Sequence, residues 1–153
     1  ELMKKFRFSL DTVLGYKQQV LDSLRSEHAA ALQRAAQQEA VVRALERRHQ
    51  ELNAEFRRAE ETGITVAEAR SYEMGLRVLE GQIQRETERL EQLRREAEEK
   101  RLQVVSARQE TASLEKLREK KLEGYRKAVQ KSDERFIDEL VLSERAASAE
   151  DAG

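Results

Sequence analysis

The chain contains no proline in its 153 residues and only six glycines. Proline breaks helices because it lacks a backbone donor and clashes with the preceding turn, and loop-rich folds need turn residues about every ten positions. Little therefore interrupts helices over most of this chain. Charged residues make up 39% of it and aromatic residues only 5%, which argues against a large globular core. The sequence predicts long helices.

The apolar residues of the first third follow a seven-residue repeat. Alternating steps of four and three residues lead from Leu10 to Ala59 without a slip, and eleven of the fifteen positions are apolar. A second repeat of this kind runs from Ala69 to Leu114. Such repeats predict a left-handed coiled coil. Its seam is expected to contain Leu10, Leu14, Leu21, Leu24, Leu45, Leu52, Phe56, Leu76, Ile83, Leu90, Leu93, Val104 and Leu114.

A short turn separates the two repeats. Gly63 is placed to adopt the left-handed conformation after a helix end, and Thr65 with Glu68 forms a capping box for a new helix. So short a connection makes the two helices antiparallel neighbours. At the other end, Ser9 is a suitable cap for the first helix, with Phe8 folding back on Val13.

The predicted fold is all-α, a long antiparallel two-helix coiled-coil hairpin with a protruding C-terminal helix. It forms a single unit over 1–153, with helix one at about 9–61, a turn at 62–64 and helix two at about 65–145. The acidic segment 146–153 is expected to be a frayed tail. Facing residues should have numbers that sum to roughly 127, which places Phe56 opposite Tyr72. The same sum pairs Lys17 with Glu110 and His28 with Glu99.

After Leu114 the repeat shifts by about four residues, which indicates a stutter in the coiled coil. The stripe continues through Leu122, Tyr125, Val129, Phe136 and Leu140, beyond the start of helix one. The overhang should measure on the order of 40 Å. Phe6 and Phe8 can reach only its first turns, so a partner protein is expected to cover the stretch from Val129 to Leu142. A self-dimer or a frayed end are the alternatives.

The end of the hairpin that contains both chain termini carries an excess of positive charge. Residues 116–131 carry a net charge of +5, and Lys4, Lys5, Arg7 and Lys17 against Asp11 add +3. A partner with acidic loops would be steered to such a surface.

Several functional classes are disfavoured. The net charge of -1 argues against nucleic acid as the main partner, and no apolar run is long enough to span a membrane or to form a secretory signal. The chain has no cysteine, and its two histidines, His28 and His49, lie roughly 31 Å apart along one helix. No catalytic residue, metal site or cofactor site is predicted, and an enzyme is not expected. Glu1 and Leu2, before Met3, are interpreted as a cloning remnant.

Motifs at both ends resemble the bacterial flagellar export protein FliJ. They are the start Phe6-Arg7-Phe8-Ser9-Leu10-Asp11-Thr12-Val13-Leu14-Gly15-Tyr16-Lys17 and the stretch Leu114-Glu115-Lys116-Leu117-Arg118-Glu119-Lys120-Lys121-Leu122-Glu123-Gly124-Tyr125-Arg126-Lys127, followed by Asp138-Glu139-Leu140. The turn, with Gly63-Ile64, is similar to the tip of that family. The resemblance covers essentially the whole chain.

This resemblance implies a non-enzymatic stalk in the flagellar type III protein export apparatus, at the cytoplasmic face of the cell membrane. The end with both termini would enter the pore of the hexameric export ATPase FliI, and the coiled coil would engage the export gate protein FlhA. Escort of export chaperones is a further implied role. The implied ATPase-binding residues are Lys120, Lys121, Leu122, Tyr125, Arg126, Val129, Phe136 and Leu140, and the implied gate contacts are Tyr72 and Leu79.

Two other classes of function stay open at the level of sequence. A generic structural or tethering coiled coil would have the same seams but would not bind an ATPase. A nucleic-acid-binding arm would use the basic end against phosphates.

Overall fold

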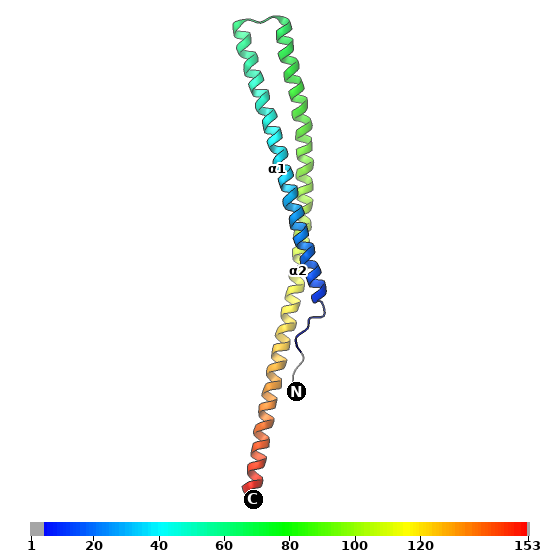
Figure 1. Ribbon diagram of the computed structural model, residues 1–153, viewed down its shortest axis with the longest axis vertical. Helices are drawn as coiled ribbons and strands as arrows, with labels where there is room; N and C mark the ends of the chain where they lie inside the picture. The colour runs from blue at the N-terminus through cyan, green and yellow to red at the C-terminus, as the bar shows by residue number, and fades with distance from the viewer. Residues whose placement is uncertain (1–4, 153) are drawn as a thin grey trace. The chain divides into compact units, whose positions relative to one another are not determined.

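The computed structural model describes residues 5–152 of the chain. This part consists of two α-helices without any strand, α1 over Asp11–Thr62 and α2 over Val66–Ala152. The two helices pack against each other as a hairpin, which confirms the predicted all-α fold class (Figure 1). The chain divides into two compact units, Leu21–Ser106 and the described parts of 1–20 and 107–153. Each unit contains a piece of both helices.

The unit Leu21–Ser106 contains the turn between the helices. Gly63 has a φ of +89°, and its N–H donates to the carbonyl of Glu60 at 3.2 Å, which closes the end of α1. The Thr65 hydroxyl accepts from the Glu68 N–H at 3.1 Å, and the Thr65 carbonyl accepts from the Ala69 N–H at 3.0 Å. Thr65 therefore caps α2 as the sequence predicts.

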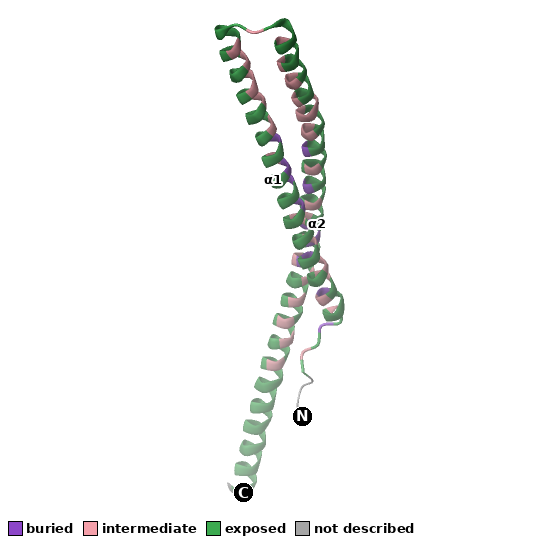
Figure 2. Ribbon diagram, turned by 45° about the horizontal axis from the view of Figure 1, so that its top comes forward, coloured by how far each residue is buried: buried purple, intermediate pink, exposed green. Residues whose placement is uncertain are grey.

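The seam of this unit changes character along its length. Small side chains are buried in its part distant from the turn, where Ala31, Ala35 and Ala97 are at most 8% exposed, and small residues let two helices approach closely. Figure 2 shows the buried residues on the facing sides of the helices. Between residues 43 and 89 no described residue is fully buried. There the Phe56 and Tyr72 rings stack, with centroids 5.1 Å apart.

Three contacts report on the predicted register. The Phe56–Tyr72 stack in one unit and the Lys17–Glu110 ion pair at 2.8 Å in the other confirm it. The predicted His28–Glu99 pair is wrong, because the ion pair at that level joins Glu27 to Lys100 at 2.9 Å. Lys100 lies in the seam, half-buried, whereas Glu99 is exposed on the outer surface.

Buried polar groups in the seam have hydrogen-bond partners. Gln38, 8% exposed, donates to both the carbonyl and the carboxylate of Glu86. Thr111, 4% exposed, donates to the carbonyl of Ala107 at 2.8 Å. A slipped register would leave the Gln38 amide buried without a partner, so this layer favours a single alignment of the helices.

The other unit contains the first turns of α1 and the C-terminal part of α2. The first helical hydrogen bond of α1 joins Leu14 N–H to the Leu10 carbonyl at 2.8 Å, so the helix begins slightly later than a Ser9 cap would place it. Phe8 is 6% exposed and lines a groove with Tyr125 of α2, while Val13 is 42% exposed. Phe8 is thus buried toward α2, and the expected staple on Val13 does not account for its burial.

The second helix is longer than expected. It continues through Ala152, so the segment predicted to be a frayed tail is helical there. Residues 130–151 are all exposed, and no helix within 5–152 has an apolar stretch long enough to cross a membrane. The interpretations placed on Glu1 to Lys4, and on Gly153, lie outside the described residues.

The glycines provide a test of the turn with opposite expected signs. Gly63→Ala should destabilise the protein by about 1 kcal/mol, because alanine is strained at the positive φ of this position. Gly15→Ala, inside α1, should stabilise it by about 0.5 to 1 kcal/mol, since a Cβ there meets nothing within 4 Å. Urea unfolding followed by circular dichroism measures both. Equal effects of the two substitutions would contradict the turn geometry.

Candidate protein-binding site

The N-terminal segment before α1 is held against α2 by aromatic and charged contacts. The Phe6 ring lies 5.7 Å from the Tyr125 ring, tilted by 47°. The Arg118 guanidinium lies 5.5 Å from the centre of the Phe6 ring, and its Nε donates to Asp11 Oδ1 at 3.1 Å. Arg118 therefore connects the N-terminal segment, the start of α1 and α2 in one cluster.

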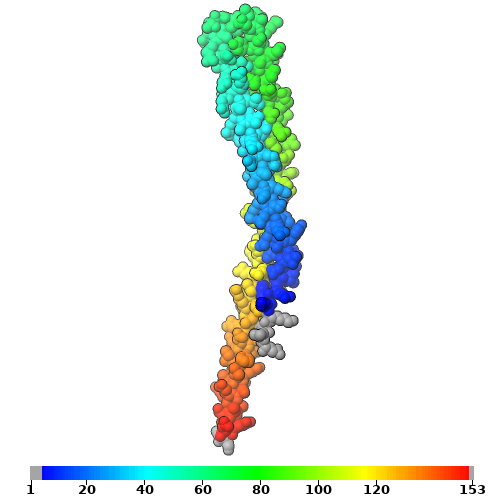
Figure 3. Space-filling view, viewed as in Figure 1, coloured from blue at the N-terminus to red at the C-terminus, as the bar shows by residue number. Residues whose placement is uncertain are grey.

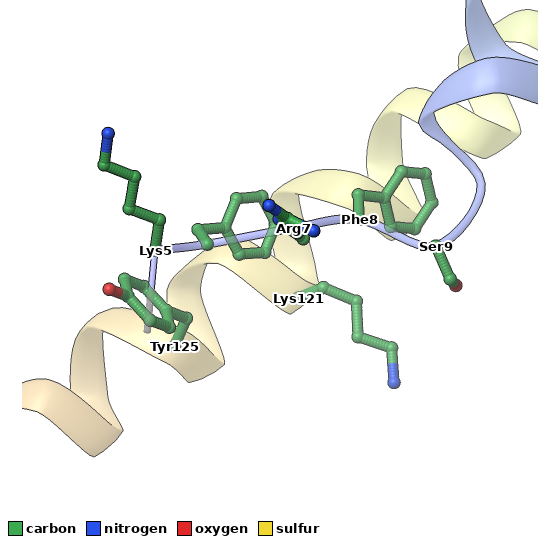
Figure 4. Close-up of a pocket in the computed structure, with 7 residues that line it drawn as sticks. Lys5, Arg7, Phe8, Ser9, Lys121 and Tyr125 are labelled. Atoms are coloured by element: carbon green, nitrogen blue, oxygen red, sulfur yellow. The ribbon is translucent and has the colours of Figure 1, made fainter. Parts of the chain in front are cut away.

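An open groove lies along this segment. Figure 4 shows the segment running beside α2, with Lys5 near Tyr125. The groove is lined by Lys5, Phe6, Arg7, Phe8, Ser9, Lys121 and Tyr125. It thus combines three cationic side chains with three aromatic rings. Such a lining suits an acidic partner that also offers apolar contacts.

The predicted ATPase-binding residues fall into two groups in the structure. Leu122, Tyr125 and Val129 are half-buried, and Leu122 lines a second groove together with Leu14 of α1. The other five, Lys120, Lys121, Arg126, Phe136 and Leu140, are exposed. The chain itself therefore covers the beginning of the predicted stripe, and its later part stays open.

Burial also locates the irregularity in the repeat. In this part of α2 the half-buried positions include Leu114, Arg118, Leu122 and Tyr125, while Lys121 is exposed. Two consecutive steps of four residues, from Leu114 to Arg118 to Leu122, replace the alternation of four and three. This is the pattern of a stutter, which locally unwinds a left-handed supercoil.

Beyond the N-terminal segment, α2 carries an exposed set of large apolar side chains. This distal apolar surface consists of Phe136, Ile137, Leu140, Val141 and Leu142, with exposed fractions of 60%, 58%, 49%, 40% and 64%. In Figure 3 this stretch of α2 is drawn orange to red, and no other described segment of the chain covers its visible face. The stripe identified from the sequence contained only Phe136 and Leu140 of these. The adjacent pairs Phe136-Ile137 and Leu140-Val141 are the signal for the wider surface.

Near the turn, the predicted gate contacts lie in the seam. Tyr72 and Leu79 are both half-buried, and the Tyr72 ring stacks on Phe56. The large apolar side chains exposed on this part of α2 are Val66, Met74 and Val78, at 71%, 69% and 55%. Spacings of eight and four residues place these three on one helix face, called here the tip apolar surface. The seam repeat does not predict this surface, because its members lie outside the repeat.

Charged side chains of the hairpin form ion pairs on exposed faces. The hydrogen bond from Lys17 to Glu110 raises the pKa of Lys17, and the bond from Arg101 lowers the pKa of Glu98. Both directions reflect pairing with an opposite charge in water-exposed positions. Within residues 5–152 no group of three histidine or carboxylate side chains is arranged to hold a metal ion.

Comparison with known proteins gives one match. A family model described as the flagellar FliJ protein matches residues 6–150 of the 153. The matched range includes both end motifs, the turn and the distal apolar surface. The comparisons with curated proteins and with solved structures gave no match.

The N-terminal cluster can be tested with a matched pair of phenylalanines. Phe6→Ala should destabilise the protein by about 1 to 2 kcal/mol, because it removes the contacts with Tyr125 and Arg118. Phe136→Ala should change stability by less than about 0.5 kcal/mol, since that ring is 60% exposed. Thermal unfolding at low protein concentration measures both. A neutral Phe6→Ala would show that the segment is not held on α2.

Proposed function

Because this chain belongs to the flagellar FliJ protein family, and so to the components of flagellar protein export, we propose that it is a non-enzymatic stalk. The proposed stalk links the hexameric export ATPase FliI to the export gate protein FlhA. The proposal places it in the cytoplasm, at the inner face of the cell membrane with the export apparatus. Its ATPase-binding part is the unit with the N-terminal segment and the C-terminal part of α2.

The observation that carries this proposal is the distal apolar surface. Burial of a large apolar side chain contributes roughly 1.5 to 3 kcal/mol, so five exposed members represent several kcal/mol of available binding energy. Exposed apolar surfaces of this kind mark interaction sites. The stretch of α2 after Arg118, which pairs with the start of α1, has 34 residues and a length of about 50 Å. A single helix of that length suits insertion into the pore of a ring.

The charge of the same unit supports an acidic binding partner. Lys120, Lys121 and Arg126 are exposed on α2, and Lys5 and Arg7 line the groove beside them. These charges would steer an ATPase pore with acidic loops toward this end of the protein and would fix its orientation, while the distal apolar surface supplies affinity.

The gate contact is assigned to the unit with the turn. Val66, Met74 and Val78 offer exposed apolar contacts there, and the half-buried Tyr72 and Leu79 lie beside them on α2. The absence of fully buried residues between 43 and 89 makes this part of the seam the easier one to rearrange on binding. Export chaperones that the protein escorts would bind the same tip apolar surface.

A paired substitution tests the assignment of the two surfaces. Phe136→Asp combined with Leu140→Asp should abolish binding to FliI, because it places charge where apolar contacts are needed. Met74→Asp combined with Val78→Asp is the matched control, since these side chains are similarly exposed but lie in the other unit. The control should keep FliI binding and lose binding to FlhA. Pull-down and surface plasmon resonance with purified partners measure both.

The outcome distinguishes the stalk from the other classes. Unchanged FliI binding by the Phe136/Leu140 variant, with helicity intact, would contradict the proposed site. A wild-type chain that binds neither FliI nor FlhA and leaves ATP turnover unaltered would indicate a generic tether. Strong, salt-sensitive binding to RNA or DNA would indicate a nucleic-acid-binding arm.

A further inference from the structure

The C-terminal part of α2 is divided into two segments of opposite charge. Residues 116–131 contain seven basic and two acidic residues, a net charge of +5. Residues 132–151 contain seven acidic and two basic residues, a net charge of -5. The stretch 116–151, called here the distal arm, is one continuous helix with a charge inversion near its middle. Two parallel copies of such a helix would repel each other, and two antiparallel copies would attract.

We propose that, in the absence of an ATPase ring, two copies of this chain pair antiparallel through their distal arms, with a two-fold axis near Ser132 and Asp133. A two-fold interface is self-complementary, and the distal arm meets that requirement with equal and opposite charges on its two halves. This goes beyond the proposed function, because it concerns the chain on its own and a different occupant for the distal apolar surface.

Apolar positions define the register of the pair. When facing residues have numbers that sum to 265, Val129 lies opposite Phe136 and Tyr125 lies opposite Leu140. A shift by one residue in one direction would place Val129 opposite Arg135. A shift the other way would place Lys121 opposite Arg145. The register with a sum of 265 therefore combines apolar layers with charge pairing. In this register the paired region extends from Leu122 to Ser143, about three heptads.

The hairpin itself supplies the geometry for the flanking charges. Its seam pair Phe56–Tyr72 sums to 128, and ion pairs that include a seam residue, such as Lys17–Glu110, have nearly the same sum. The ion pair Glu39–Arg94, at 3.7 Å, has both members beside the seam and sums to 133. The flanking offset is thus five residues. The same offset in the paired arms gives a sum of 270 and brings together opposite charges, each pair occurring twice by symmetry: Lys131 with Glu139, Arg126 with Glu144 and Lys120 with Glu150.

The same offset also produces a few unfavourable contacts. Arg135 meets its own copy at the two-fold axis, and Glu119 meets Asp151 near the ends. Beyond Ser143, the acidic end of the partner copy approaches the groove lined by Lys5, Arg7 and Lys121. That groove adds cations for Glu150 and Asp151, so the attraction outweighs these two contacts.

Pairing of the arms has a consequence for binding to the ring. It covers Phe136 and Leu140, which the proposed function assigns to FliI, so a second copy and the ATPase compete for one surface. Three heptads of exposed pairing give a weak and reversible dimer, and surface charge pairs make it salt-sensitive. The dimer protects the distal apolar surface from nonspecific association until a ring displaces the second copy.

Charge-swap variants of the chain alone test this proposal. Variant one carries Arg126→Glu, Lys127→Glu and Lys131→Glu, and variant two carries Asp138→Lys, Glu139→Lys and Glu144→Lys. Sedimentation equilibrium should show a wild-type dimer at about 0.2 mM protein in low salt. Each variant alone should have its dissociation constant raised at least about tenfold, and an equimolar mixture should associate again as a heterodimer.

A control and two outcomes keep the test decisive. Glu88→Lys, Glu91→Lys and Glu96→Lys change the same number of exposed charges in the other unit and should leave association unchanged. A wild-type chain that remains monomeric in low salt would overturn the proposal. So would a mixture that associates no more than either variant alone. Neither measurement uses the ATPase, so failure here is distinguishable from failure of the proposed function.

Spin labels determine the orientation of the two arms. The protein has no cysteine, so single labels are introduced with Ser132→Cys or Ser143→Cys. An antiparallel pair should give a short distance between the two labels at 132. The two labels at 143 should lie about 30 Å apart, because 21 residues separate them along the paired helices at 1.5 Å per residue. Short distances at both positions would mean a parallel pair and would overturn the proposed symmetry.

Discussion

An apolar stripe on an uninterrupted helix is stabilised only where a second helix covers it, and this constraint governs the whole chain. α1 has 52 residues and α2 has 87, and both carry such a stripe. The ion pair between Asp11 and Arg118 marks the level at which α1 begins, and the extended segment from Lys5 reaches Tyr125. Beyond that level no other helix among residues 5–152 covers α2. Its exposed apolar residues follow from the mismatch in helix length.

The seam shows how the chain holds one register with little apolar bulk. Alanines bury little area each, so layers such as Ala31 and Ala97 stabilise mainly by close packing of the helices. Specificity then comes from polar layers, above all Gln38 with Glu86, which a slipped register would leave unpaired. Toward the turn the stacked rings of Phe56 and Tyr72 replace the alanines, and no residue there is fully buried. Tight packing and loose packing are thus encoded by residue size along one repeat.

The sequence predicted those features that depend on local or periodic signals. The turn followed from Gly63 and Thr65, whose roles depend on backbone geometry alone, and the register followed from two repeats with a fixed connection. The choice between two pairs at one level could not be predicted in the same way, as the ion pair of Glu27 with Lys100 in place of His28 with Glu99 shows. Both pairs have numbers that sum to 127, so the register alone does not decide which of them forms. Ile137, Val141 and Leu142 lie within the stretch Val129 to Leu142 that was expected to bind a partner, but the stripe did not include them because they lie outside the repeat.

The helical state of the exposed part of the distal arm follows from its attachment to the hairpin. An isolated helix of this size would be marginal in water, because forming the first turn is unfavourable and most helical stability comes from packing. Here the part of α2 that is paired with α1 already supplies the first helical turns. Each further residue of the arm only has to extend an existing helix. Local contacts between Glu123 and Lys127 and between Gln130 and Glu134 support that propagation. The arm therefore presents its apolar and charged side chains in a pre-ordered array, which lowers the conformational entropy that any partner must overcome on binding.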